Sequence, residues 1–321
     1  MTGAQDAMLF TRSTANPIIG TADVPYPSNS VFNPGAARIG DETILLLRIE
    51  DLRGISQLHV ARSHDGATDW RFDPEPLLRS DGHPEEIWGC EDPRLTWLPE
   101  REEWAIAYTA YSRRGPLVSL ATTRDFRSVH RLGPVMPPEN KDAALFPRRI
   151  GGRWAMIHRP SPLRGGAHMW MSFSPDLRHW GDHSVILEAR DGAWWDAGKI
   201  GLGPPPLETP EGWLVLYHGV HATGDGPIYR AGLALLDLDD PGIVLHRTDE
   251  WVFGPTAPYE ISGDVGRVVF PCGWVHDEER DRLHLYYGAA DTVIGLATAS
   301  FRAVMARVLG APAGAEGSGG A

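Results

Sequence analysis

Two adjacent carboxylates, Glu91 and Asp92, lie in the stretch WGCEDPRLTW, between two tryptophans and directly before a proline. Such a pair can supply an acid and a base for hydrolysis, or it can lie on a solvated turn. Three basic residues, Arg48, Arg159 and His218, each end a short apolar stretch. If the fold brings these three together, their mutual repulsion favours an anion such as phosphate between them.

A more ordinary interpretation of the three basic residues is that they form ion pairs with acidic neighbours such as Glu50 and Asp51. Two lysines offer further positive charge. Lys141 in PPENKDAALFP and Lys199 in WWDAGKIGLGPPP each precede an expected strand. Single lysines are usually solvated, but both of these would enter a channel if those strands line one.

Four other charged residues are candidates for ligand binding. Asp264 in SGDVGRVVFP and Asp291 in YYGAADT belong to the fifth copy of the repeated pattern, and either could bind sugar hydroxyls. Arg113 and Arg114 in YSRRGP could reach a phosphate group, or they could form a charged β-turn. The sequence alone does not decide between these roles.

Other chemistries lack their sequence motifs. The chain contains no P-loop, no dinucleotide-binding glycine pattern, no nucleophile elbow and no zinc-protease pair. Its cysteines, Cys90 and Cys272, are far apart and have no metal-ligand spacing, which fits a reducing compartment, with one disulfide as the alternative. We therefore expect no metal and no organic cofactor.

The composition limits the partners. The 321 residues carry a formal net charge of −12, which disfavours nucleic acid and anionic membranes as partners. No run of apolar residues is long enough to span a bilayer, and MTGAQDAMLF does not read as a signal peptide. These features predict a cytoplasmic protein, with a homo-oligomer as an open possibility.

A three-part pattern recurs five times along the chain and predicts its architecture. Each copy has a proline-containing stretch, an apolar strand and an alternating strand that ends in a turn. The apolar strands are TILLLR, WAIAYT, WAMIHR, WLVLYH and LHLYYG. The anchoring prolines are spaced by 59, 54, 59 and 65 residues and are Pro34, Pro93, Pro147, Pro206 and Pro271.

Five such copies predict an all-β protein, a five-bladed β-propeller, with a β-sandwich as the alternative. The 36 glycines and 27 prolines suit a fold with many turns. We expect residues 1–308 to form one propeller domain and residues 309–321 to form a disordered tail. In this alignment the counterparts of Asp92 are Asn33, Phe146, Pro205 and Phe270.

The motifs together resemble glycoside hydrolase family 130, the inverting β-mannoside phosphorylases and their relatives. The resemblance extends from NPGAARI to YYGAADTVIGLATA, which is nearly the whole chain. The fold of that family is a five-bladed propeller, and the resemblance implies the same fold here. The stretches that carry it include RIEDLRGISQLHVARSHDG, EDPRLT, NKDAALFP, GPPP, WLVLYHGV and VVFPCG.

The resemblance implies specific roles. Asp92 would be the catalytic acid, which relays its proton through the mannose 3-hydroxyl, and Glu91 would support it. Inorganic phosphate would be the co-substrate and would attack the anomeric carbon to give α-mannose 1-phosphate, so no second catalytic carboxylate is required. The sugar would bind Asn33, Arg48 and Asp291. The phosphate would bind Lys141, Arg159, Lys199 and His218.

Three alternatives remain open at this stage. A hydrolase of the same family would need a base about 6.5–9.5 Å from the acid, for which Asp264 or Glu260 are candidates. A propeller that binds glycans without catalysis would use Asp92 only as an acceptor. Glycosidases that act on arabinosides or fructosides would need three carboxylates, for which Asp92, Asp264 and Asp291 are available. The leaving sugar and its linkage are not predicted.

Overall fold

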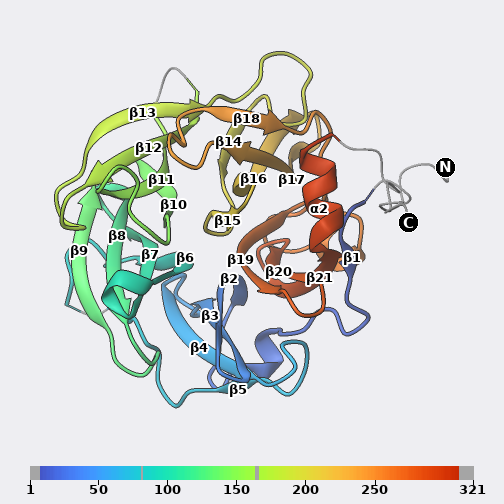
Figure 1. Cartoon of the computed structure of the whole chain (residues 1–321). Helices are drawn as coiled ribbons and strands as arrows, with labels where there is room; N and C mark the ends of the chain where they lie inside the picture. Colours follow the sequence, from blue (N-terminus) through green and yellow to red (C-terminus); the bar gives the residue numbers. More distant parts are fainter. Residues whose placement is uncertain (1–7, 81, 163–165, 311–321) are drawn as a thin grey trace.

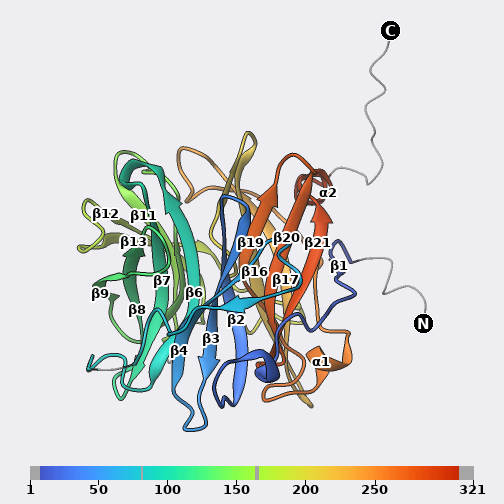
Figure 2. The same ribbon diagram turned by 90° about the horizontal axis from the view of Figure 1, so that it is seen from below.

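The protein is all-β, as predicted. A computed structural model describes residues 8–80, 82–162 and 166–310, and within them nearly every regular element is a strand. Strands of antiparallel sheet form groups that surround a common centre (Figure 1). Figure 2 shows neighbouring groups side by side along their strands, with the short helix α1 (Pro258–Ile261) and helix α2 (Phe301–Val308) at opposite ends.

Each group corresponds to one copy of the sequence pattern. The first contains β2 (Ser30–Ile39), β3 (Glu42–Glu50), β4 (Ser56–Ser63) and β5 (Arg71–Phe72). The second contains β6 (Gly89–Leu98), β7 (Glu103–Ser112), β8 (Gly115–Thr123) and β9 (His130–Met136). The third contains β10 (Asn140–Leu145), β11 (Trp154–Pro160), β12 (Met169–Ser174) and β13 (Gly181–Leu187).

The last two groups are less regular. The fourth contains β14 (Lys199–Leu202), β15 (Leu207–Thr209), β16 (Gly212–Thr223), β17 (Gly226–Leu236) and β18 (Val244–Arg247). The fifth contains β19 (Val269–Asp277), β20 (Arg282–Ala289), β21 (Val293–Ser300) and, from the other end of the chain, β1 (Thr11–Arg12). The first and second groups join through one parallel pair, Ser56 with Gly89.

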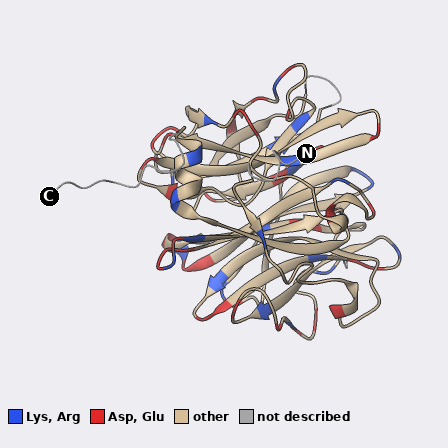
Figure 3. Cartoon of the chain, turned by 90° about the vertical axis from the view of Figure 1, so that its right-hand side faces the viewer, with Lys and Arg blue, Asp and Glu red and all other residues tan. Residues whose placement is uncertain are grey.

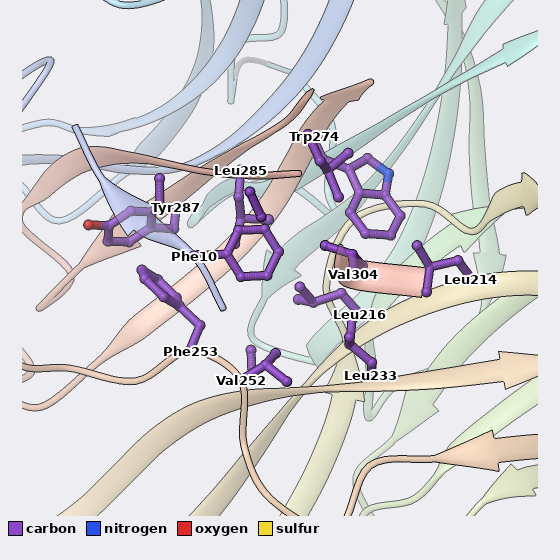
Figure 4. Close-up of a cluster of buried hydrophobic side chains, with 14 of the residues drawn as sticks. Phe10, Leu214, Leu216, Leu233, Val252, Phe253, Trp274, Leu285, Tyr287 and Val304 are labelled. Carbon is purple, nitrogen blue, oxygen red and sulfur yellow. The ribbon is translucent and has the colours of Figure 1, made fainter. Parts of the chain in front are cut away.

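The hydrophobic core lies between the groups. Five main clusters of buried side chains each connect two neighbouring groups, so every sheet packs one face on each neighbour. Figure 4 shows the cluster between the fourth and fifth groups. It contains Phe10, which precedes β1, and Val304 of α2, together with Leu216 and Tyr287. Figure 3 shows charged residues of both signs mainly on loops and strand ends.

The first strands of the groups approach the centre (Figure 1), and those of the first three groups carry β-bulges that hold a polar residue. In β2 the bulge holds Asn33, in β6 Asp92 and in β10 Asp142, and these three residues have φ values of 49°, 49° and 54°. Asn and Asp tolerate this left-handed conformation better than other non-glycine residues.

This register corrects part of the sequence alignment. The third-group counterpart of Asp92 is Asp142, not Phe146, because both residues lie in the bulge of their inner strand. Pro147 and Pro206 lie outside the inner strands β10 and β14. A proline is therefore an unreliable marker of the position equivalent to Asp92. In the first three groups the β-bulge marks that position.

Candidate active site

The carboxylate of Asp92 lies buried beside two hydrogen-bond donors. Its Oδ1 accepts from Asn33 Nδ2 at 2.9 Å and from Arg48 Nη1 at 3.0 Å. Asn33 and Asp92 come from the bulges of adjacent inner strands, and Arg48 pairs with Phe32 on β2. The bulges thus bring together side chains from residues 59 positions apart.

The guanidinium of Arg48 holds both members of the carboxylate pair. Nη2 donates to Glu91 Oε1 at 3.0 Å, and Nε donates to Ser56 Oγ at 2.9 Å. All three types of guanidinium nitrogen are therefore used, which fixes the plane of the group. Glu91 thus forms a close ion pair with Arg48, and its supporting role stays a prediction.

The two adjacent carboxylates differ in acidity. Burial raises the pKa of Glu91, and the charge of Asp92 raises it further. Burial acts in the same direction on Asp92, but Arg48, Arg94 and Lys141 together hold the Asp92 pKa below its ordinary value. Asp92 is accordingly the more acidic member of the pair.

A second buried carboxylate, Asp142, organises the opposite side of the site. Its Oδ2 accepts from Arg159 Nε at 2.7 Å and lies 3.6 Å from His218 Nε2. Its Oδ1 lies 3.5 Å from Arg94 Nη2. Burial alone would raise the pKa of Asp142, but Arg159 and the other nearby basic groups hold it far below its usual range.

The imidazole of His218 is neutral at physiological pH. Burial lowers its pKa to about 3, and Arg159 and Lys199 add to this effect. His218 can therefore offer a hydrogen bond, but it does not add the third positive charge that the sequence suggested. Arg48, Arg159 and His218 do occupy equivalent strand positions, yet Arg48 serves Asp92 whereas the other two contact Asp142.

One pocket of about 180 Å³ collects all eight predicted site residues. Its lining includes Asn33, Arg48, Asp92, Lys141, Arg159, Lys199, His218 and Asp291, together with Asp142, Tyr229, Val265, Val268 and Phe270. Lys141 and Lys199 lie within the inner strands, near their beginnings, and not in preceding loops. Lys199 Nζ lies over the ring of Tyr229, 5.2 Å from its centre.

Two lining residues have polar atoms that no protein group satisfies. Asn33 Oδ1 and both ring nitrogens of His218 are buried without a hydrogen-bond partner. Buried polar atoms are nearly always paired, so unpaired ones that line a pocket indicate a ligand position. Asp291 also lines this pocket, and burial followed by the charge of Asp92 raises its pKa to about 7.

Four residues weighed from the sequence lie outside this lining. Glu260 is fully buried and binds Arg12 through both oxygens at 2.7 Å, so its carboxylate is already occupied. Asp264 is exposed and accepts from Asn29 at 3.1 Å. Arg113 and Arg114 form the exposed turn between β7 and β8.

Sequence reasoning missed Asp142 and Arg94. Asp142 directly follows Lys141 and lies in the β-bulge of β10 with a left-handed backbone conformation. The available signal in the sequence was an aspartate, a residue type that tolerates this conformation. Arg94 donates to the backbone oxygen of Asp92 at 2.7 Å and to that of Leu202 at 3.0 Å. Arg94 is the arginine of EDPR, so the sequence showed that it lies close to Asp92. Its contact with Asp142 could not be predicted from the sequence.

A larger cavity of about 340 Å³ lies at the opposite ends of the strands. Its two arginines already have partners, because Arg280 pairs with Asp277 at 2.8 Å and Arg38 donates to Thr43 at 3.3 Å. The chemistry of acid and cations belongs instead to the smaller pocket around Asp92.

The described residues contain neither a cluster of metal ligands nor a membrane-spanning helix. Among residues 8–80, 82–162 and 166–310, no group of three His, Cys, Asp or Glu side chains could hold a metal ion. In the same ranges no helix has the length and apolar character needed to cross a bilayer. Cys90 and Cys272 are both buried free thiols, so the alternative of a disulfide between them is wrong.

Comparison with known proteins gives consistent matches over most of the chain. The sequence profile of a family described as beta-1,4-mannooligosaccharide phosphorylase matches residues 14–309. A beta-1,2-mannobiose phosphorylase of Listeria innocua is 42% identical over 75% of this chain and 65% of its own length. A beta-1,4-mannooligosaccharide phosphorylase of Ruminococcus albus is 35% identical over 89% of this chain and 87% of its own.

Solved structures agree with the sequence matches. The Listeria innocua beta-1,2-mannobiose phosphorylase, solved in complex with beta-1,2-mannobiose, superposes with a TM-score of 0.85. That superposition covers 94% of this chain and 99% of the other at 32% identity.

Proposed function

The chain belongs to glycoside hydrolase family 130, and from this premise we propose that it is an inverting β-mannoside phosphorylase. Its substrates would be a β-mannoside and inorganic phosphate, and its product α-mannose 1-phosphate. We further infer that the five groups of strands are the blades of a propeller, with the pocket at one end of its central axis. A cytoplasmic location, where phosphate is plentiful, is part of the same proposal.

One observation supports phosphorolysis above the alternatives. The buried carboxylate of Asp92 shares its pocket with Lys141, Lys199 and Arg159, while Asp142 offsets part of their charge. A phosphate dianion needs such cations both for binding and for alignment with the bond that breaks. A site that only binds neutral glycans gains nothing from them.

The proposed reaction uses few protein groups. A phosphate oxygen held by Lys141, Lys199, Arg159 and His218 forms a bond to the anomeric carbon as the bond to the leaving sugar breaks. In the forward direction Asp92 must first take up a proton, which it then delivers through the mannose 3-hydroxyl to the leaving oxygen. In the reverse direction, ionised Asp92 accepts a proton from the acceptor sugar, and this is its state in the unliganded protein.

The hydrolase alternative has little support in the pocket. Its two candidate bases, Glu260 and Asp264, lie outside the lining, and Glu260 is bound to Arg12. The lining carboxylates other than Asp92 are Asp142, which contacts Arg159, and Asp291. The three-carboxylate arrangement with Asp264 is likewise not gathered in one pocket.

The reverse reaction tests the proposal directly. Purified protein would be incubated with α-mannose 1-phosphate and a panel of acceptors that includes mannose, glucose and N-acetylglucosamine, and phosphate release would be measured. We expect release that depends on one acceptor and falls by at least about 10³-fold in Asp92→Asn. Cleavage of β-1,2- or β-1,4-mannobiose at the same rate with and without phosphate would instead establish a hydrolase.

A further inference from the structure

Asp142 is a buried acid in a pocket that is proposed to bind an anion. A carboxylate there opposes phosphate binding by simple repulsion. Burying it also costs free energy that well-packed apolar side chains would avoid. Its presence between Arg159, His218 and Arg94 therefore requires an explanation beyond stability.

The contacts of Asp142 connect three groups of strands at one point. Arg159 of β11 donates from Nε to Asp142 Oδ2 and from Nη1 to Ser161 Oγ at 2.8 Å. These two hydrogen bonds fix the plane of the guanidinium group. His218 of β16 lies 3.6 Å away on the same oxygen, and Arg94 of β6 approaches the other oxygen. The backbone leaves space for this contact only because residue 201 is glycine.

Gly201 pairs with His218, and a Cβ there would lie 2.5 Å from His218 Cε1 and would collide with the Asp142 carboxylate. Arg94 extends the connection toward the acid, since it also donates to the backbone oxygen of Asp92 at 2.7 Å. One carboxylate thus links two residues of the proposed phosphate subsite to the strand that carries Asp92.

We propose that Asp142 is a positioning residue that holds Arg159, beside the ring of His218, in the geometry that binds phosphate, and that it does not itself contact the sugar. This inference rests on the proposed function. Asn at position 142 offers only one acceptor oxygen and no charge, so it cannot hold Arg159 and Arg94 together. Phosphate affinity should fall, whereas the mannoside contacts of Asn33 and Arg48 should remain.

Titration calorimetry on the whole chain tests the inference with inorganic phosphate and, separately, with β-1,2- and β-1,4-mannobiose. Asp142→Asn should weaken phosphate binding by about 10- to 100-fold, the equivalent of one hydrogen bond to a charged group, and change mannobiose affinity less than about threefold. Unchanged phosphate affinity, or an equal loss for both ligands, would overturn it.

Asp73→Asn is the matched control. That carboxylate binds Arg62 through both oxygens at 2.8 and 2.9 Å, beside the far end of β4 and outside the pocket lining. It should lose stability without losing phosphate affinity. A generic effect of deleting an arginine-bound carboxylate would instead weaken phosphate binding in both variants, which contradicts the inference.

Gly201→Ala provides a second variant if Asp142→Asn does not fold. Its backbone needs no left-handed conformation, so the main effect of alanine is that its Cβ meets the Asp142 carboxylate and the His218 ring. The same selective loss of phosphate affinity is expected. Wild-type protein that binds mannobiose but not phosphate would refute the proposed function as well, whereas wild-type phosphate binding with two unaffected variants would refute only the positioning role.

Discussion

At the scale of single residues, the site separates carboxylates by their surroundings. Asp92 accepts hydrogen bonds from Arg48 and Asn33 and stays ionised. In contrast, burial and the charge of Asp92 raise the pKa of Asp291 to about 7. Asp142 is ionised because Arg159 and Arg94 surround it. Three aspartates in one pocket therefore differ in acidity, and only the one with the raised pKa titrates near neutral pH.

The first prediction follows from Asp291. Below pH 7 its carboxyl is largely protonated, and as pH rises through about 7 it ionises and adds negative charge to the pocket. The KM for phosphate should therefore rise above pH 7. Asp291→Asn should lack this contribution, so the ratio of wild-type to variant KM should increase by about 3- to 10-fold between pH 6 and pH 8.

Steady-state kinetics at a series of pH values would measure this ratio. The titration of phosphate itself affects both proteins equally and cancels. A ratio that does not depend on pH would show that Asp291 does not titrate in this range.

At the scale of strands, the sequence predicted elements better than register. The five apolar segments correspond to β3, β7, β11, β16 and β20, because the apolar pattern depends on local periodicity. Equivalent positions in the inner strands depend on where a bulge inserts an extra residue, which local hydrophobicity does not specify. Asn33 and Asp92 were placed correctly because a proline follows each, and Asp142, followed by alanine, was missed.

The second prediction concerns the close approach of inner strands. Gly35 of β2 lies against β6, where an added Cβ would be 2.8 Å from the backbone oxygen of Pro93 and 3.0 Å from Leu95 Cγ. Since backbone cannot yield easily, Gly35→Ala should destabilise the protein by about 1–3 kcal/mol in urea unfolding. It should also reduce activity by displacing Asn33 relative to Asp92.

Gly181→Ala is the control, because nothing lies within 4 Å of its added Cβ and its φ is not positive. It should change stability by less than about 0.5 kcal/mol. Equal effects from the two substitutions would contradict the argument from close approach.

At the scale of the whole molecule, the two ends of the described chain meet in the fifth group. Strand β1 adds to the edge of β21 with Thr11 opposite Thr298 and Arg12 opposite Ala297. Arg12 also binds the fully buried Glu260 and lies over the ring of Phe253, 4.6 Å from its centre. The N-terminal segment is therefore an integral part of the sheet that adjoins the first group.

The third prediction tests this closure. Arg12→Ala would leave Glu260 charged, buried and without its arginine, which costs about 3–5 kcal/mol. Urea or thermal unfolding would measure the loss. Arg53→Ala removes an exposed arginine paired with Asp51 at 2.7 Å and should cost less than about 1 kcal/mol. Comparable losses for the two variants would show that the Arg12 contact does not secure the fifth group.

The pairing of β1 with β21 also determines an order of events during synthesis. The ribosome releases β1 long before it releases β21, so the N-terminal segment emerges without its partner and must stay unpaired while the intervening strands appear. Domains otherwise tend to fold from the N-terminus onward as they emerge. Among the described strands, β1 is made first and is among the last to be seated, and a nascent chain that stalls before residue 293 cannot complete its fifth group.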